Sequence, residues 1–383
     1  MSDPARPLPY GRQMVDEQDI AAVVDVLRSD WLTTGPVVGR FEQAFAEAVG
    51  ARHAVAVANG TAALHCAYYA LGLGPGDEVL VPALTFAATA NAVAMRQATP
   101  VFTDVDPDRL LVDPASVEAR LTPATRAIVA VDYAGQPCDY ARLRDVATRA
   151  GVPLVADACH ALGARYQGRP AGSLADVSIF SFHPVKHITT GEGGMVVTDD
   201  EALAARARLF RQHGISSDHR ARDAAGTTGY EMIDLGFNYR LSDINCALGL
   251  SQLRRLDAFL TARRALAAEY DRRLAGRRGI TPLAVAPDVD HAYHLYVVAL
   301  DVPSAAARDQ VASALRARGI RCAVHYPPVH LHPYYRRAFG GHEGLCPVAE
   351  SQAARILSLP MFPGLEPADV ARVVDALVEA LPA

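Results

Sequence analysis

The chain has 383 residues, of which 50% are hydrophobic and 21% are charged, and its 42 acidic and 37 basic residues give a formal net charge of −5. This composition argues against intrinsic disorder and against a cationic nucleic-acid-binding protein, so we expect small-molecule partners and no nucleic acid. The length is enough for two domains of about 100 to 200 residues each.

Short apolar runs alternate with longer segments rich in alanine and leucine, after two helical patterns at residues 17–28 and 39–49. Seven of these runs are strand candidates, several of them apolar on both faces: residues 54–58, 78–81, 100–103, 127–131, 153–157, 177–181 and 195–198. This alternation predicts an α/β fold with a mainly parallel sheet covered by helices. Ligands of such sheets bind beyond the carboxyl ends of the strands, so polar residues just after these runs are the site candidates.

The pattern changes after about residue 250. An arginine-rich helical stretch at 251–274 is followed by strand candidates at 294–300 and 321–325, a helix at 305–318 and a closing helix from Pro367. We predict a large domain at residues 1–250 that includes an N-terminal arm. Residues 251–383 are expected to form a connector helix and a smaller C-terminal α+β domain.

No apolar run approaches the roughly 18 to 20 residues that span a bilayer, and the first thirteen residues do not resemble a secretory signal. We therefore expect a cytoplasmic protein that does not bind membranes. The six cysteines contain no CxxC pair, which argues against a zinc ribbon and a redox dithiol.

One residue stands out in the basic composition, because 36 of the 37 basic residues are arginine and only Lys186 is lysine. Arginine remains protonated and cannot act as a neutral amine nucleophile, so Lys186 is a candidate for covalent chemistry with an aldehyde. It lies in a loop that follows a strand candidate and ends in glycines at residues 191–194. The alternatives are a surface lysine left by compositional drift and a phosphate anchor, although arginine would serve the second purpose equally well.

A carboxylate, Asp157, ends the strand candidate at residues 153–157. Alone, such an aspartate is more often a helix cap. Near a lysine that carries pyridoxal phosphate, it would keep the ring nitrogen protonated, which the cofactor needs as an electron sink. His160 could then orient Asp157 or contact the ring hydroxyl.

A phosphate site is predicted at Gly60 and Thr61, where a strand ends and a helix begins, because free amide groups at a helix start bind anions. The signal is weak on its own, since the preceding Asn59 could simply cap the helix. Ser181 could supply a second hydroxyl. Phe86 could stack on a flat cofactor ring, or it could belong to the core.

Together these motifs resemble the sugar aminotransferases of the DegT/DnrJ/EryC1/StrS family, which have the fold of type I pyridoxal-phosphate enzymes. The resemblance extends over most of the chain and is carried by residues 9–11, 32–36, 59–61, 157–160, 186, 236–243 and 325–328. Residues 132–138, 181–194 and 211–215 are most similar to the pseudaminic-acid branch, the UDP-4-amino-4,6-dideoxy-N-acetyl-beta-L-altrosamine transaminases. These enzymes aminate C4 of a UDP-linked 4-keto-6-deoxy-N-acetylhexosamine.

The resemblance implies roles for the cofactor residues. Lys186 would form a Schiff base with pyridoxal 5'-phosphate, and Asp157 would hold the pyridine nitrogen. Thr61 and Ser181 would bind the phosphate and Phe86 would stack on the ring. Asn238 would reach the phosphate from the neighbouring subunit, so the resemblance implies a homodimer with a shared active site.

The resemblance also implies a reaction in two halves. An amino donor, L-glutamate by resemblance, would leave pyridoxamine 5'-phosphate as the intermediate form of the cofactor, and the keto sugar would then take the amino group. Lys186 would act as base and acid. Arg240 is the first choice for the diphosphate of the nucleotide, and Tyr10, His325 and Tyr326 are candidates on the sugar side.

Three alternatives stay open at this stage. The histidines at residues 325, 330 and 332 could bind a transition metal, although their spacing matches no common site, and we expect none. A non-catalytic sensor could keep the cofactor and sugar sites. The substrate could also be a different nucleotide keto-deoxysugar, such as a dTDP-linked one.

Overall fold

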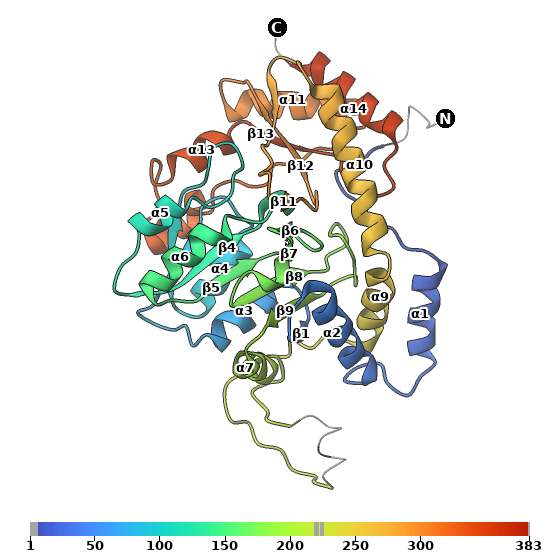
Figure 1. Ribbon diagram of the computed structural model, residues 1–383, viewed down its shortest axis with the longest axis vertical. Helices are drawn as coiled ribbons and strands as arrows, with labels where there is room; N and C mark the ends of the chain where they lie inside the picture. Colours follow the sequence, from blue (N-terminus) through green and yellow to red (C-terminus); the bar gives the residue numbers. More distant parts are fainter. Residues whose placement is uncertain (1–6, 218–221, 223–225, 382–383) are drawn as a thin grey trace.

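A seven-stranded sheet forms the centre of the computed structural model, which describes residues 7–217, 222 and 226–381 (Figure 1). Its strand order is β1-β9-β8-β5-β4-β2-β3. The seven strands are β1 His53–Val57, β2 Glu78–Pro82, β3 Thr99–Thr103, β4 Thr125–Val131, β5 Leu154–Asp157, β8 Val177–Ser181 and β9 Gly194–Thr198. The predicted α/β fold and all seven strand candidates are confirmed.

The sheet is parallel except at β9, which pairs antiparallel with β1 and with β8. Because β9 runs the other way, its first residue, Gly194, pairs with Val57 and Ser181 at the carboxyl ends of its neighbours. The segment between β8 and β9 therefore leaves and re-enters the sheet at one edge, and it carries Lys186.

Both faces of the sheet are covered by helices, as apolar strands require. In β1, Val55 and Val57 pack in the cluster that contains α3, whereas Ala54 and Ala56 pack on the opposite face in the cluster that contains α2. In the described part of the chain up to residue 253, the helices include α1 Glu17–Leu27, α2 Pro36–Val49, α3 Gly60–Ala70, α4 Ala88–Met95, α5 Pro114–Ala119, α6 Tyr140–Ala150, α7 Glu201–Arg211 and α9 Asp243–Leu253.

The C-terminal part is built on a second sheet of three strands in the order β10-β12-β13. It shares an apolar cluster with α10, α11 and α14, which lie around it at one end of the molecule (Figure 1). The elements are α10 Leu256–Leu274, β10 Ile280–Pro282, β12 Tyr296–Leu300, α11 Ala305–Ala317, α12 Pro333–Phe339, α13 Pro347–Ala353, β13 Ile356–Leu359 and α14 Pro367–Ala380. A small third sheet contains β6 Arg165–Tyr166, β7 Arg169–Pro170 and β11 Val289–Asp290. The domain boundary at residue 250 stays a prediction.

Two predicted elements differ from the structure. The helical stretch at 251–274 is broken after α9, and the long helix α10 begins only at Leu256. The strand predicted at 321–325 is wrong, because only Ala323 forms a bridge, with Ser358. Pro327 and Pro328 follow directly and have no amide hydrogen, so they cannot continue a ladder.

The N-terminal arm crosses to the C-terminal part of the molecule. Leu8 donates its amide hydrogen to the Gly319 carbonyl at 2.8 Å and accepts one from Arg321 at 2.9 Å. The carbonyl of Tyr10 accepts the amide hydrogen of Met361 at 2.9 Å. These bonds fix the backbone on both sides of Pro9 and hold Tyr10 in place.

None of the helices in the described part of the chain combines the length and the apolar character needed to cross a bilayer.

Candidate active site

A cavity of about 460 Å³ opens at the carboxyl ends of β1, β5 and β8. Ten of the twelve predicted site residues line it: Tyr10, Gly60, Thr61, Phe86, Asp157, His160, Ser181, Lys186, His325 and Tyr326. Residues that are far apart in the sequence therefore meet in one place, as the rule for ligand sites in parallel sheets predicts.

Lys186 lies in the loop between β8 and β9, and its backbone amide donates to the His183 carbonyl at 2.8 Å. Burial lowers the pKa of the Lys186 amine from its ordinary value, whereas the nearby Cys159 and Asp157 act in the opposite direction. Burial disfavours the charged ammonium because the interior solvates it poorly. Burial therefore makes the neutral amine, which condensation with an aldehyde needs, easier to form than in an exposed lysine.

The start of α3 provides free amide groups at the cavity. Asn59 caps the helix, since its side-chain oxygen accepts the amide hydrogen of Ala62 at 2.8 Å. The amides of Gly60 and Thr61 donate to no acceptor within the described residues, so they are available to an anion together with the helix dipole. The capping and phosphate interpretations are therefore compatible.

Two glycines allow this helix start to lie close to β8 and β9. A Cβ atom on Gly60 would lie 3.1 Å from the Cβ of Ser181, which places the two predicted phosphate residues side by side. A Cβ atom on Gly194 would overlap the carbonyl of Asn59. The glycines at the end of the Lys186 loop therefore permit close packing as well as turns.

Asp157 ends β5 and is buried at the base of the cavity. Its Oδ2 accepts a hydrogen bond from the Thr89 hydroxyl at 2.7 Å, and its Oδ1 accepts a longer one from the Cys159 amide at 3.3 Å. The helix-cap interpretation is wrong, because a turn and not a helix follows β5. Sequence reasoning missed Thr89, which follows the predicted residue Phe86 by three positions but has no pattern of its own.

Aromatic side chains form one wall of the cavity. The Phe86 ring is 59% exposed, so Phe86 is not a core residue, and its centroid lies 5.8 Å from that of Tyr326. The Tyr10 ring lies 5.4 Å from His325, whose Nδ1 is 2.9 Å from the Ser358 hydroxyl. Residues from both ends of the chain thus enclose the predicted sugar side.

Uncharged histidines surround the lysine. Burial lowers the pKa of His160 well below its ordinary value and lowers that of His325 to about 4, and the Lys186 charge lowers both further. The Nε2 atom of His160 lies 3.0 Å from the Tyr326 hydroxyl. His294 also lines the cavity, 4.3 Å from His160 between ring centroids, although no spacing in the sequence identified it.

Two predicted site residues lie elsewhere. Arg240 lines a separate hollow of about 720 Å³ with Thr34, Gly35 and Ser216, and its guanidinium donates to Gln212 at 3.2 Å. Asn238 lines neither hollow and forms a backbone bridge with Gln212. The roles of both residues stay predictions.

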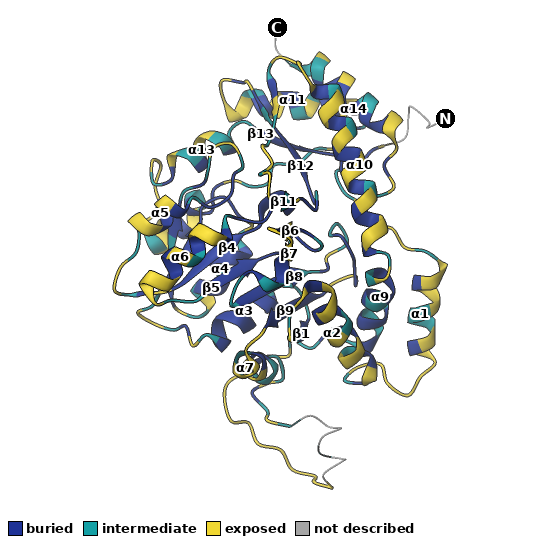
Figure 2. Ribbon diagram, viewed as in Figure 1, coloured by how far each residue is buried: buried dark blue, intermediate teal, exposed yellow. Residues whose placement is uncertain are grey.

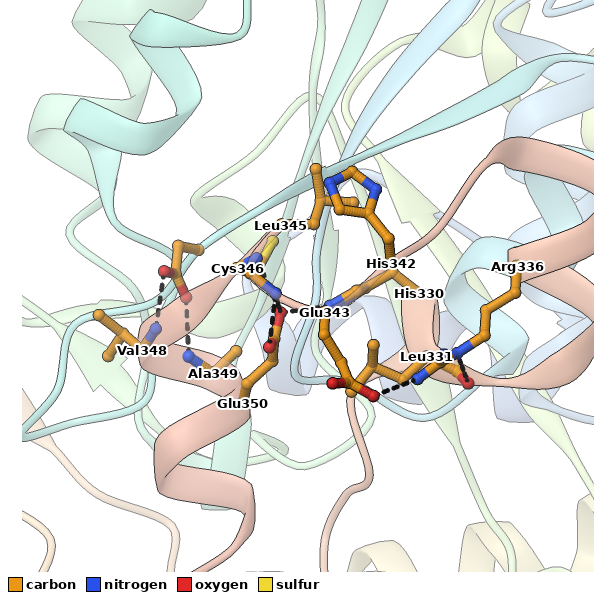
Figure 3. Close-up of polar contacts among 12 residues, drawn as sticks. His330, Leu331, Arg336, His342, Glu343, Leu345, Cys346, Val348, Ala349 and Glu350 are labelled. Atoms are coloured by element: carbon orange, nitrogen blue, oxygen red, sulfur yellow. Dashed lines mark hydrogen bonds and ion pairs between the residues drawn. The ribbon is translucent and has the colours of Figure 1, made fainter.

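The histidines considered as metal ligands have separate partners. His330 is buried, and its Nε2 lies 2.9 Å from Glu350, which also accepts the amide hydrogens of Gly344 and Cys346 (Figure 3). This network joins α13 to the loop before it, while His325 faces the cavity. Among the residues that the structure describes, no group of three histidine, cysteine or acidic side chains is placed to hold a metal ion.

Asp132 is a second buried acidic residue near the cavity. Its backbone amide donates to the backbone carbonyl of Asp157 at 3.1 Å. Its Oδ1 accepts hydrogen bonds from the Cys138 amide and the Tyr140 hydroxyl, both at 3.0 Å, while its Oδ2 is buried without a partner. Burial raises the pKa of Asp132 to about 7. Since the pKa in the unfolded chain is about 4, the stability of the fold should decrease as the pH rises from about 4 to about 7.

The substitution Asp132→Asn should remove this pH dependence. Asparagine keeps the accepting oxygen and resembles the protonated carboxyl group, so we expect the variant to be more stable than the wild type at pH 8 by about 4 kcal/mol and equally stable near pH 4. Thermal unfolding of both proteins across this pH range measures the effect. A constant difference at all pH values would contradict the expectation.

A loop lysine, a buried aspartate and a helix start with free amides meet at one cavity, which is the arrangement expected of a pyridoxal-phosphate enzyme of fold type I. The family model of the DegT/DnrJ/EryC1/StrS aminotransferases matches residues 13–378. The chain belongs to this family and is a pyridoxal-phosphate-dependent sugar aminotransferase.

Solved structures similar to this chain agree. They include the putative sugar aminotransferase Spr1654 from Streptococcus pneumoniae in its PMP form, with 31% identity, 97% of this chain and 98% of that chain covered, and a TM-score of 0.93. PseC from Helicobacter pylori, an aminotransferase of pseudaminic acid biosynthesis, has 31% identity, coverage of 98% and 99%, and a TM-score of 0.91. DesV from S. venezuelae has 39% identity, coverage of 99% and 100%, and a TM-score of 0.89.

Proposed function

We propose that the protein transfers the amino group of L-glutamate to C4 of a UDP-linked 4-keto-6-deoxy-N-acetylhexosamine, a step of pseudaminic acid biosynthesis. The observation that carries the proposal is the convergence of Lys186, Asp157 and the start of α3 on one cavity. An amine, a carboxylate and an anion site in that arrangement match the aldehyde, ring nitrogen and phosphate of the cofactor.

In this proposal Lys186 is the residue that moves protons. Its neutral Nζ would take the proton from the α-carbon of glutamate and later deliver a proton to C4 of the sugar. When bound, pyridoxal phosphate supplies the electron sink that makes the α-proton acidic. Because the pKa values of His160 and His325 are lowered, these two side chains add no positive charge beside this amine at neutral pH.

The other residues would bind and orient. Asp157 would hold the positive charge of the ring nitrogen, and the amides of Gly60 and Thr61 with the Ser181 hydroxyl would bind the phosphate. Phe86 is exposed at the cavity and would cover one face of the ring. Tyr10 and the pair His325 and Tyr326 would contact the sugar from the C-terminal side of the cavity.

A second copy of the chain would complete the site. The nucleotide substrate carries a diphosphate, yet no arginine is among the described residues that line the cavity. In a homodimer, the partner would contribute Arg240 to the diphosphate and Asn238 to the cofactor phosphate. Guanidinium groups suit this task because they bind phosphate oxygens in pairs.

The segment between α7 and α9 supports the dimer. Its residues 226–235 are exposed and lie away from the body of the molecule (Figures 1 and 2). Four large apolar side chains on it are between 61% and 69% exposed: Tyr230, Met232, Ile233 and Leu235. Exposed apolar side chains grouped in this way are typical of a surface that a partner covers.

A second candidate function differs from the first in the nucleotide of the sugar substrate. DesI, with 36% identity to this chain, is described in the presence of its TDP-sugar product, and DesV is also more similar in sequence than PseC. A dTDP-linked keto-deoxysugar is therefore the second candidate substrate.

A substrate panel tests the proposal. The purified protein is incubated with ¹⁵N-glutamate and with UDP- and dTDP-linked 4-keto-6-deoxy sugars, and the amino sugar is detected by mass. We expect the UDP-linked N-acetylhexosamine to gain one ¹⁵N atom and an equal amount of 2-oxoglutarate to form. Labelled product from dTDP sugars alone would support the second candidate. Bound cofactor without product from any sugar would contradict both and favour a sensor.

A further inference from the structure

Two threonine hydroxyls form a buried chain behind Asp157. Thr89 Oγ1 lies 2.7 Å from Asp157 Oδ2, and Thr85 Oγ1 lies 2.8 Å from Thr89 Oγ1. The exposed fractions are 0% for Thr89, 1% for Thr85 and 6% for Asp157. Because these side chains are buried, water does not compete with Thr85 for Thr89 or with Thr89 for Asp157.

The direction of these hydrogen bonds follows from the number of protons. A threonine hydroxyl has one hydrogen, and Thr89 uses it for the carboxylate, which only accepts. Thr85 must then donate to Thr89. The chain runs from Thr85 through Thr89 to Asp157, and each hydroxyl that donates strengthens the next bond.

Thr89 itself is held rigidly. It is in the first turn of α4, its amide donates to the Phe86 carbonyl at 3.1 Å, and its carbonyl accepts the Tyr68 hydroxyl at 3.2 Å. The other hydrogen bond to the carboxylate, from the Cys159 amide, is longer at 3.3 Å. The hydrogen bond from Thr89 is therefore the one that determines the orientation of the Asp157 carboxylate.

We propose that Thr89, oriented by Thr85, is a positioning residue for Asp157: it fixes the plane of the carboxylate, so that a remaining lone pair can accept a hydrogen bond from the protonated ring nitrogen of the cofactor. A carboxylate has about four acceptor sites, and Thr89 and Cys159 occupy two. The inference rests on the role of Asp157 in the proposed function.

The test compares two ligands of the full-length protein after removal of its cofactor. One is pyridoxal phosphate, and the other is its analogue in which carbon replaces the ring nitrogen. Both keep the aldehyde and the phosphate, so only the contact with Asp157 differs. For Thr89→Val, which keeps the shape but not the hydroxyl, we expect the dissociation constant of pyridoxal phosphate to rise about 10- to 100-fold, the range for a lost hydrogen bond to a charged group. The dissociation constant of the analogue should not change.

Two further variants separate positioning from a structural role. Thr89→Ser keeps the donor and should restore wild-type affinity within about threefold, while Thr85→Val should weaken pyridoxal phosphate binding in the same selective way by a smaller factor of about three. Equal weakening of both ligands, or failure of the serine variant to restore binding, would overturn the proposal. If Thr89→Val does not fold, the Thr85→Val result decides, since selective weakening supports the chain and unchanged binding contradicts it.

Asp157→Asn distinguishes failure of this inference from failure of the proposed function. If this variant loses the preference for pyridoxal phosphate over the analogue but Thr89→Val does not, only the positioning role is wrong. If Asp157→Asn keeps the preference, Asp157 does not hold the ring nitrogen and both proposals about this carboxylate fail.

Discussion

Replacing Lys186 with arginine should abolish amino transfer. The arginine side chain stays protonated, so it can neither condense with an aldehyde nor take a proton from the donor. Loss of acid–base catalysis alone costs about 10²- to 10⁴-fold, and loss of the covalent step adds to it. We therefore expect product formation at least about 1000-fold below wild type with the same keto sugar and glutamate.

The single lysine makes this prediction unusually direct to check. Borohydride reduction of the wild-type protein should fix the cofactor on the one lysine-containing peptide, which peptide mass mapping identifies. In the arginine variant, no internal peptide should carry it. Thermal unfolding of the cofactor-free proteins serves as the control for folding. Activity of the variant near the wild-type level would refute the assignment of Lys186.

Mixed dimers should recover activity that neither parent variant has. Lys186→Ala removes the amine, and Asn238→Asp places a negative charge where we propose that the partner meets the phosphate, which costs several kcal/mol for like charges. In a heterodimer of the two variants, one site combines the intact Lys186 with the intact Asn238 of the other chain. The purified heterodimer should therefore have about half the wild-type activity, and an unseparated random mixture should have about a quarter.

Co-expression with two different affinity tags isolates the heterodimer, and each homodimer purified in the same way is the control. Full activity of the Asn238→Asp homodimer would show that Asn238 does not serve the site. Two inactive parents that give an inactive heterodimer would show that the two residues act within one chain.

Sequence reasoning identified what depends on local pattern. The seven strands of the large sheet are short, apolar and bounded by turns, so periodicity located them to within two residues. The choice of Lys186 came from chemistry, since one lysine among 36 arginines needs an explanation. The rule that ligands bind at the carboxyl ends of strands then brought Asp157 and Thr61 to the same edge.

Features that depend on long-range packing could not be predicted in this way. Thr89 reaches Asp157 through a hydrogen bond between residues 68 positions apart, and His294 lines the cavity beside His160, and no local pattern marks either residue. Phe86 was ambiguous because an aromatic residue after a strand fits a core as well as a cavity. The false strand at 321–325 shows the opposite error, in which a strand was predicted where only Ala323 pairs with β13, through a single bridge to Ser358.

The arm that carries Tyr10 has a consequence for how the enzyme matures. Leu8 and Tyr10 are bonded to Gly319, Arg321 and Met361, and Tyr10 shares the cavity wall with His325 and Tyr326. Leu8 and Tyr10 can therefore form these contacts only after residues up to Met361 have been synthesised. A ribosome-bound nascent chain that stops before β13 should lack the contact with Met361 and should have an open cavity. Binding of the cofactor would then indicate that the whole subunit has been synthesised and has folded.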